Sequence, residues 1–449
     1  IGDDIYCPDV WQDEQLQNDY VHYYLSKNTD QPDLCYIIGK FMRCSTNHPS
    51  KIRHSGDKAK LISANDESNF TFKGRYDNAQ QAATVGFESS QKMHNALKYL
   101  ISTQGERIGD KVFLLWGTMD ENVPKLNSDT FDLMASDDDL SEYSDTKREC
   151  AIRFNRAING YKENLVFSNK NSKLAIIGLD AATTGRMSII YYKEFIGLQC
   201  VELIENIEHW HESCQWYHTY RTNDKKVVPF YGVPSAYKIA LCACANDSGG
   251  YLSENKINRI TIANIAQRLI PCITEKRKIP RDVVSLLIRK SLYPLSYENQ
   301  YNWDTVLSVT CSMYKKYLYD YKGEEITMTT DTKNQSISFK CGRLLAVADK
   351  LEYYALYLAS GGKNEKIRTT NAMRFFTQFH TNPSRTWIQI EKKLIPYINY
   401  LGSKAKYYTD LIDEIANEID PEEFLKLKHL NADMLIGFHS QRYEINERI

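Results

Sequence analysis

A glycine-containing turn at Gly178–Ser188 is the first candidate for chemistry, because it follows an apolar stretch as a phosphate-binding loop does. A P-loop has four residues between its two glycines, then Lys and Ser or Thr, and a helix whose N-terminus faces the phosphates. Here six residues separate Gly178 from Gly185, Arg186 and Met187 follow, and the next segment has the pattern of a strand. The turn therefore does not predict nucleotide hydrolysis.

Two histidines and two cysteines with close spacing could act as metal ligands. His209 and His211 lie two residues apart in an expected helix, so their side chains point about 200° apart and cannot reach one ion. Cys242 and Cys244 have the same spacing. We expect His211, which lies on the apolar face of its helix, to be a hydrogen-bonded core residue.

A looser cluster near the start of the chain consists of Cys35, Cys44 and His48. Thiolates and imidazoles are zinc ligands, so a structural zinc site is conceivable there, although no fourth ligand is evident. The carboxylates Asp137–Asp139 lie in a polar stretch, and we expect them to be solvated. No His-Asp dipeptide and no nucleophile elbow occurs. The sequence therefore predicts no catalytic activity, no metal site of the catalytic kind and no cofactor.

The composition excludes several classes of protein. The 449 residues are enough for two or three domains, and 56 Lys and Arg against 57 Asp and Glu give a net charge of −1. This balance excludes a globally basic nucleic-acid binder but leaves local basic patches open. The 11 cysteines form no repeating framework, which favours reduced thiols in a cytoplasmic protein. We expect no membrane span, and Ile1 in place of Met leads us to expect that the natural N-terminus is missing.

The elements that position these residues change along the chain. Residues 1–60 are loop-rich, and residues 61–128 form an α/β segment with a helix over Asn78–Thr103 and a strand over Lys111–Trp116. Residues 129–149 are acidic, which indicates a solvated linker. We interpret 1–60 as the remnant of an N-terminal domain.

The second half of the chain shifts toward helical patterns. Residues 150–334 form an α/β to helical body, with strands over Lys173–Asp180 and Arg186–Tyr192 and a helix after Gly197. Residues 335–449 have the pattern of a helical bundle, broken at Asn382-Pro383 and Asp420-Pro421. We therefore expect an α+β fold, with a mixed α/β body and a C-terminal helical bundle.

Basic residues gather locally in three places, with aromatic residues nearby, as suits phosphate neutralisation and base stacking. An ordinary solvated helix face is the alternative for each residue. The clusters are Lys73, Arg75 and Lys92 around the first helix; Arg268, Lys276, Arg277, Lys278, Arg281, Arg289 and Lys290; and Lys340, Arg343, Arg374, Arg385, Lys392, Lys393, Lys404 and Lys406 in the bundle.

Several motifs together resemble one family, in order from about residue 35 to the end. They are Phe72–Arg75, Val85–Leu97, Gly178–Ser188, Ile207–His211, Leu269–Ile273, Ile279–Asp282, Gly342–Asp349 and Leu435–Gln441, the last with small departures at Phe438 and Ser440. The chain is similar to the large subunit of the type I-C CRISPR surveillance complex, Cascade.

This resemblance implies a subunit without catalytic activity in a complex that holds a guide RNA. Such a subunit recognises the protospacer-adjacent motif on duplex DNA, helps to open the duplex, binds the displaced strand and recruits a separate helicase-nuclease. Base pairing with the guide reads most of the target, while protein side chains read a short motif and hold the phosphates. The family carries a long N-terminal portion before the point at which this chain begins, so no motif-reading residues are assigned.

The resemblance also implies partners and roles. The partners are the guide RNA with its backbone and RNA-end-binding subunits, double-stranded DNA, the displaced strand and the helicase-nuclease, with no membrane. We expect phosphate contacts from Lys73, Arg75, Lys92, Arg186, Lys276, Arg277, Lys278 and Arg281, and displaced-strand contacts from Lys340, Arg343, Lys392, Lys393, Lys404 and Lys406. Gln91, Lys92 and Asn95 either contact nucleic acid, pack against the helix core or contact a neighbouring subunit. The alternative function is a structural scaffold that contacts other proteins and no DNA.

Overall fold

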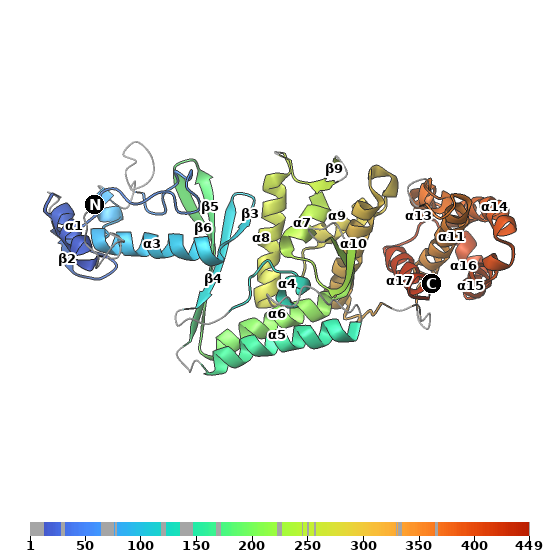
Figure 1. Ribbon diagram of the computed structural model, residues 1–449, viewed down its shortest axis with the longest axis horizontal. Helices are drawn as coiled ribbons and strands as arrows, with labels where there is room; N and C mark the ends of the chain where they lie inside the picture. The colour runs from blue at the N-terminus through green and yellow to red at the C-terminus, as the bar shows by residue number, and fades with distance from the viewer. Residues whose placement is uncertain are drawn as a thin grey trace, which may run out of the picture. The chain divides into compact units, whose positions relative to one another are not determined.

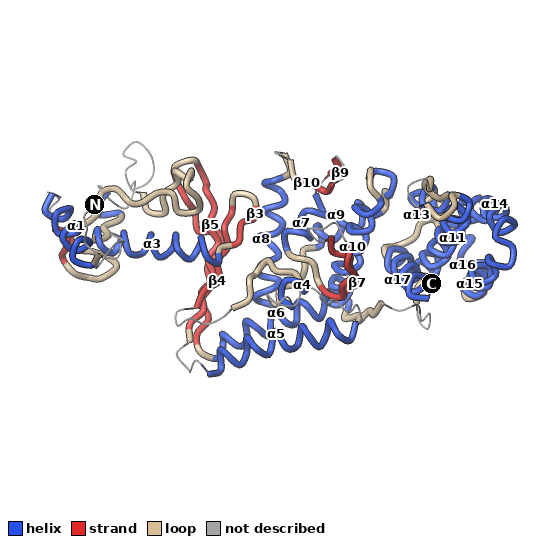
Figure 2. The backbone as a smooth tube through the Cα atoms, in the orientation of Figure 1, coloured by secondary structure: helices blue, strands red, loops and turns tan. Residues whose placement is uncertain are grey.

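The computed structural model describes residues 13–27, 32–63, 76, 79–117, 123–134, 147–167, 172–221, 227–244, 246–248, 251–255, 257–328, 330, 335–363 and 367–448. The chain forms two compact units, Ile1–Gly105 with Gly178–Tyr191 and Glu106–Ile177 with Tyr192–Ile449. Short sheets occupy the earlier part, and beyond β10 (Tyr251–Ser253) the described chain contains only helices and loops (Figures 1 and 2). The predicted α+β class is confirmed.

The first unit is built on one long helix and a small hairpin. Its described elements are α1 (Glu14–Lys27), β1 (Pro32–Leu34), β2 (Phe41–Arg43), α2 (Ala79–Ala82) and α3 (Phe87–Gln104). Strands β1 and β2 pair antiparallel. Ser90, His94 and Ile101 form the buried stripe of α3, so the opposite face of this helix is left for solvent or partners.

The helix predicted over Asn78–Thr103 is interrupted, and Asn78 itself lies outside the described residues. Between α2 and α3 the carbonyl oxygen of Thr84 accepts the N–H of Tyr36 at 3.0 Å, and that of Val85 accepts the N–H of Ser45 at 2.8 Å. Because these carbonyls bond to a segment far away in sequence, they cannot continue a helical ladder. Helical periodicity on the two sides did not reveal this break.

A four-stranded sheet has the order β3-β4-β5-β6. Its strands are β3 (Glu106–Ile108), β4 (Lys111–Gly117), β5 (Lys173–Thr183) and β6 (Arg186–Ile196). The three predicted strands are confirmed, and β5 and β6 are longer than expected. The tip of the β5–β6 hairpin, residues 178–191, belongs to the first unit, and the rest of the sheet belongs to the second.

The segment predicted as an acidic linker is partly helical. Helix α4 (Thr130–Met134) buries Phe131 and Leu133, and the Asp129 carboxylate accepts the N–H of Asp132 at 2.7 Å at its start. Helix α5 (Lys147–Phe167) begins before the predicted end of the linker. The interpretation as solvated chain is thus wrong at both ends, because two large apolar side chains suffice to anchor a short helix. Asp137–Asp139 lie outside the described residues.

The body of the second unit packs helices around a β-ribbon. Helix α5 lies beside α6 (Figure 1), and α8 is followed by α9 and α10. The described elements after α5 are α6 (Leu198–Cys214), β7 (Trp216–Arg221), β8 (Val227–Gly232), α7 (Ala236–Cys244), β9 (Asn246–Ser248), β10, α8 (Arg259–Glu275), α9 (Arg281–Ser291), η2 (Pro294–Ser296) and α10 (Gln300–Lys322).

His211 is the core histidine that its position on α6 predicted. Its Nδ1 lies 2.7 Å from the Thr130 hydroxyl, which also accepts the N–H of Val233 at 2.7 Å. The His211 ring is therefore hydrogen-bonded to the Thr130 hydroxyl within the core. Burial lowers the pKa of His211 to about 3, so the ring stays neutral in the folded protein.

The C-terminal helices surround one central helix. Helix α11 (Ile337–Ala359) packs against α14 (Pro383–Leu401), α15 (Lys406–Asn417) and α17 (Asp433–Arg448) (Figure 1). Every residue from Cys341 to Asp349 is buried. The other elements are α12 (Asn371–Arg374), α13 (Phe376–Thr381), η4 (Gly402–Ala405) and α16 (Pro421–Lys426). The breaks expected at the two proline positions are confirmed as the starts of α14 and α16.

Two glycines let α11 and α17 approach each other closely. A Cβ atom on Gly342 would overlap the carbonyl oxygen of Met434, and one on Gly437 would overlap that of Phe339. The backbones of the two helices are therefore in contact at these points. Both glycines lie in motifs that carried the family resemblance, which gives those motifs a structural meaning.

Candidate nucleic-acid interface

Four of the predicted bundle lysines are exposed on three consecutive elements of the helical part. Lys392 and Lys393 lie on α14, Lys404 on η4 and Lys406 at the start of α15. Within the described part of the chain, none of the four forms an ion pair with an acid. Their charge is thus available for an external anion, as a phosphate contact requires.

The buried stripe of α14 explains why its lysines face outward. Thr386, Trp387, Ile390, Leu394 and Leu401 are buried, which leaves the opposite side to solvent. That side also exposes large apolar groups. They are Ile388, Ile395 and Tyr400, the last 58% exposed, with Tyr407 at the start of α15. Tyrosine rings beside lysines suit base stacking next to phosphate binding.

Lys340 and Arg343 of α11 have partners inside the protein. The Lys340 ammonium donates to the carbonyl oxygen of Glu418 at 2.8 Å. Arg343 is 4% exposed, and its Nε donates to Gln441 Oε1 at 2.7 Å. Burial lowers the pKa of the Arg343 guanidinium, and Glu418 at 4.0 Å partly offsets this. The expected role of Arg343 at a strand is thus corrected to a link between α11 and α17, since no phosphate can reach the group.

A second basic corner joins α8 to α9. Lys276 ends α8 in the left-handed conformation, and Lys276, Arg277, Lys278 and Arg281 are all exposed. Two residues of α10 hold the connection in place. Asp320 accepts the N–H of Ile279 at 2.8 Å, and the Tyr321 hydroxyl donates to the carbonyl of Ile279 at 3.0 Å. The basic side chains therefore project from a rigid turn.

The charges of this corner are only partly free. Arg277 forms an ion pair with Glu275 at 2.9 Å. Lys278 and Arg281 both lie over the ring of Tyr321, at 5.1 and 4.2 Å from its centroid. A cation above an aromatic ring keeps its charge available to an anion on its other side. Sequence reasoning missed Tyr321, because it is 40 residues from Arg281 and no local pattern links them.

The predicted residues of the first unit differ in whether their charges are paired and in whether the structure describes them. Gln91, Lys92 and Asn95 share a face of α3, but Lys92 pairs with Glu88 at 2.6 Å. Arg186 is exposed at the β5–β6 turn, where its backbone pairs with that of Lys60. Lys73 and Arg75 lie outside the described residues. The structure places Arg186 and the α3 group in one unit and the other described candidates in the second.

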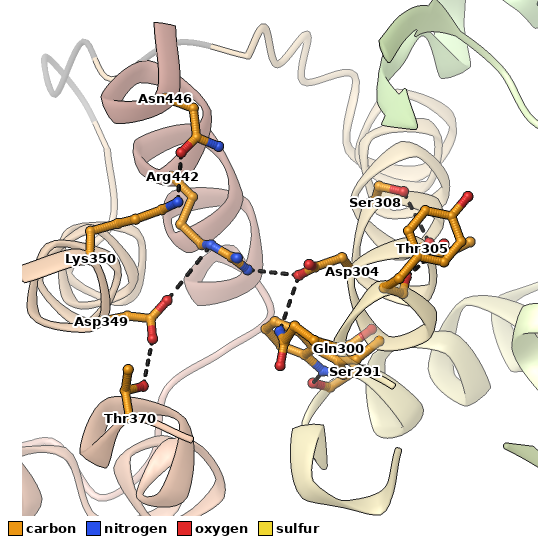
Figure 3. Close-up of polar contacts among 12 residues, drawn as sticks. Ser291, Gln300, Asp304, Thr305, Ser308, Asp349, Lys350, Thr370, Arg442 and Asn446 are labelled. Atoms are coloured by element: carbon orange, nitrogen blue, oxygen red, sulfur yellow. Dashed lines mark hydrogen bonds and ion pairs between the residues drawn. The ribbon is translucent and has the colours of Figure 1, made fainter. Parts of the chain in front are cut away.

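Sequence reasoning missed a polar cluster that joins α10, α11 and α17. Arg442 of α17 bonds Asp304 of α10 at 2.7 Å and lies 3.8 Å from Asp349 of α11, and the Lys350 ammonium donates to Asn446 at 2.6 Å (Figure 3). Burial and the neighbouring Arg442 lower the pKa of Lys350 to about 8. Arg442 thus ties α17 to both the body and the central helix. Its partner in α10 is 138 residues away, so no spacing rule reveals it.

The suspected zinc ligands are engaged elsewhere. Cys35 Sγ accepts the N–H of Gly86 at 3.2 Å, and His48 Nδ1 lies 2.9 Å from Ser90 Oγ. Across the described ranges, no group of three or more His, Cys, Asp or Glu side chains could hold a metal ion. The described cysteines are free thiols. The structure thus gives no support to a zinc site at Cys35, Cys44 and His48.

The comparison with protein families is decisive. The family model of the CRISPR-associated protein (Cas_Csd1) matches residues 3–446. This chain belongs to the Cas_Csd1 family. Members of the Cas_Csd1 family are the large subunit of type I-C Cascade, a structural and generally non-catalytic role. No curated protein matches the chain.

Membership of the Cas_Csd1 family confirms the resemblance drawn from the motifs. It makes other CRISPR-associated proteins the partners of this chain. No helix in the described part of this Cas_Csd1 member has the length and apolar character that crossing a membrane requires.

Proposed function

We propose that this Cascade large subunit binds the displaced DNA strand on the lysine corner formed by Lys392, Lys393, Lys404 and Lys406. The observation that carries the proposal is that these exposed lysines have no acidic partner among the described residues and lie on the same elements as Tyr400 and Tyr407. Cations hold phosphates without reading sequence, and tyrosine rings stack on unpaired bases. A displaced strand offers both groups.

The α8–α9 corner has a different role in the proposal. Its rigid turn presents Lys276, Lys278 and Arg281 close together, which suits the fixed phosphate spacing of a duplex. We assign this corner to contacts with the backbone of double-stranded DNA. Arg186 and the α3 face with Gln91, Lys92 and Asn95 are secondary candidates for contacts with nucleic acid or a neighbouring subunit.

Family membership supports proposing the finer activities as well. In this proposal the subunit takes part in recognition of the protospacer-adjacent motif, in duplex opening and in recruitment of the helicase-nuclease, in the cytoplasm. Its partners are the guide RNA and the backbone and RNA-end-binding subunits. The guide supplies most of the sequence specificity, so the protein needs to read only a short motif.

The test uses the full chain assembled with its partner subunits and a guide RNA. Duplex targets with and without the adjacent motif are compared, and displaced-strand protection is measured by permanganate footprinting. The quadruple variant K392A/K393A/K404A/K406A should leave assembly and guide content unchanged but expose the displaced strand. K276A/K278A/R281A should instead weaken initial duplex capture.

The matched control is Lys426→Ala, which removes an exposed lysine of α16 that already pairs with Glu422 at 3.2 Å. This variant should behave as the parent chain. Unchanged protection and capture in both multiple variants, with intact complexes, would support the scaffold function instead.

A further inference from the structure

A half-open cavity of about 320 Å³ lies in the body of the second unit, between the β7–β8 ribbon, the start of α7 and α10. Its size is at the lower end of the range of small-molecule sites, roughly 300–1,000 Å³. It therefore suits one compact group and not an extended chain. The residues assigned above to DNA contacts do not line it.

Three aromatic side chains line this cavity. Phe230 comes from β8, Tyr237 from α7 and Tyr301 from α10. Aromatic rings in a half-open cavity favour a planar group that can slide between them or stack on them. A nucleobase has this shape, and proteins that take a base out of a stack hold it between aromatic and apolar side chains.

Polar groups stand in the same wall. Asp129 lines the cavity, and one of its carboxylate oxygens accepts the N–H of Asp132 at the start of α4. Asn302 donates from its amide nitrogen to Asp247 at 2.9 Å, and within the described residues its amide oxygen has no hydrogen bond. A carboxyl oxygen and an amide oxygen can accept from the exocyclic amino groups of a base.

His218 adds an unsatisfied group. Its Nδ1 lies 3.0 Å from the Ser308 hydroxyl, and that hydroxyl donates to the carbonyl of Thr305 at 3.0 Å. Nδ1 therefore carries the proton, and Nε2 is the acceptor. This Nε2 is buried without a hydrogen-bond partner among the described residues. Because this atom is closed off from solvent, it lies behind the cavity surface, and no ligand contact is assigned to it.

Lys238 supplies a charge for the group attached to the base. It is half-exposed, lines the cavity and forms no ion pair with an acid among the described residues. A base entering the cavity brings a phosphate with it at the entrance. Lysine binds such a phosphate as a point charge.

We propose that this cavity takes one unstacked nucleobase of single-stranded DNA, with Lys238 on the adjoining phosphate. This inference rests on the proposed function, because the displaced strand is the source of the base. It adds to that function a defined position at which one nucleotide of the strand is bound. Stacking at this point is independent of sequence, while Asp129 and Asn302 favour bases with amino groups.

The first experiment is photo-crosslinking in the assembled complex. A target whose displaced strand carries 5-iododeoxycytidine, a base with an exocyclic amino group, at one position at a time is bound, irradiated and digested, and the crosslinked peptides are identified by mass spectrometry. The proposal expects one position to crosslink to Phe230, Tyr237 or Tyr301. Crosslinks confined to the lysine corner would overturn it while leaving the proposed function intact.

The second experiment uses variants. Tyr237→Leu removes one ring and should weaken binding of a single-stranded oligonucleotide by roughly tenfold, because the stacking contact with one base is lost. Tyr237→Phe keeps the ring and should bind as the parent chain, although it loses the hydroxyl contact with Glu254 at 3.3 Å. Lys238→Ala, a surface change, should weaken binding without altering the melting temperature.

The control for ring loss is Tyr293→Leu, a 52% exposed tyrosine that does not line the cavity. Equal binding by Tyr237→Leu, Lys238→Ala and Tyr293→Leu would overturn the cavity proposal. If the quadruple lysine variant also bound normally, the proposed function would fail with it. Binding of free deoxynucleoside monophosphate without any cavity crosslink to the strand would also overturn the proposal.

Discussion

Four described histidines are kept neutral by their surroundings. Burial, the largest cause in each case, lowers the pKa of His48 to about 4 and those of His211, His218 and His439 to about 3. Unfolded histidine binds a proton below about pH 6.5. Between these values the unfolded chain therefore holds more protons than the folded one.

Stability should accordingly fall as the pH drops from 6.5 toward 3. Each of these histidines contributes a slope of up to about 1.4 kcal/mol per pH unit. Urea midpoints measured at pH 8, 6.5 and 5 should decrease only over the lower interval. His211→Leu should make this decrease shallower, whereas the exposed His54→Leu should not. Equal acid sensitivity of both variants would contradict the assignment.

Arg343 and Lys392 provide a second test at the scale of single residues. Arg343→Met leaves the fully buried Gln441 amide oxygen without its donor, so it should destabilise the fold by about 1–3 kcal/mol. It should not change DNA affinity in complexes that assemble. Lys392→Met should instead lower DNA affinity and leave the stability of the fold unchanged. Chemical denaturation and filter binding of both variants would separate a structural cation from a binding one.

The sequence identified the kinds of residue at the proposed interface but not their accessibility. Arg343 lies beside Leu344 and Val347 in a pattern that predicts a one-sided apolar stripe. Neighbouring elements cover α11 on all sides between Cys341 and Asp349, so even residues off the stripe are buried there. Exposure of a charge in a central helix depends on neighbours from distant segments, which periodicity does not contain.

At the scale of elements, the crossing of α11 and α17 depends on Gly342 and Gly437. An added methyl group at Gly437 meets the backbone of α11, which cannot move away as a side chain can. Gly437→Ala should therefore separate the helices and destabilise the protein by about 1–3 kcal/mol, as overpacking does. Thermal unfolding followed by circular dichroism measures this loss.

The matched control is Gly160→Ala in the middle of α5. Gly160 is exposed, and a Cβ there would meet nothing within 4 Å. Alanine should stabilise this helix by about 0.5–1 kcal/mol, because it loses less backbone entropy than glycine. A melting temperature that falls in the control as much as in Gly437→Ala would refute the explanation by close helix packing.

Most long elements were predictable, and the exceptions have a common cause. Helices after residue 261 follow clear apolar periodicity, and the predicted strands are present. The interruption between α2 and α3 and the helix α4 were missed. In each case contacts with distant residues, through backbone hydrogen bonds at Thr84 and Val85 or burial at Phe131, outweigh local preference.

At the scale of the whole molecule, a net charge of −1 coexists with a local lysine corner. Each lost contact with a single strand reduces the salt dependence of binding by about 0.7 in a plot of log affinity against log salt. The quadruple variant at Lys392, Lys393, Lys404 and Lys406 should flatten that slope by up to about 3. Titrations of a single-stranded oligonucleotide at salt concentrations of roughly 50–300 mM would measure this slope.

Lys426→Ala should leave the slope as it is, since its charge is already balanced by Glu422. A slope unchanged by the quadruple variant would place the strand elsewhere on the protein. The cavity variants, in contrast, should lower affinity with little change of slope when only Tyr237 is altered, because stacking releases no counterions.

The first unit is not continuous along the chain, since it needs both residues 1–105 and the hairpin tip at 178–191. During synthesis, its first part therefore leaves the ribosome well before its last strands exist. At about 5–20 residues per second, the delay before the tip emerges is several seconds. Through that interval the loop at Lys60 lacks the backbone partners that Gly185 and Met187 of the hairpin tip provide in the folded chain. A gene truncated after residue 105 should consequently yield an incomplete unit that proteases degrade, and a shortened 106–177 segment would reduce the wait.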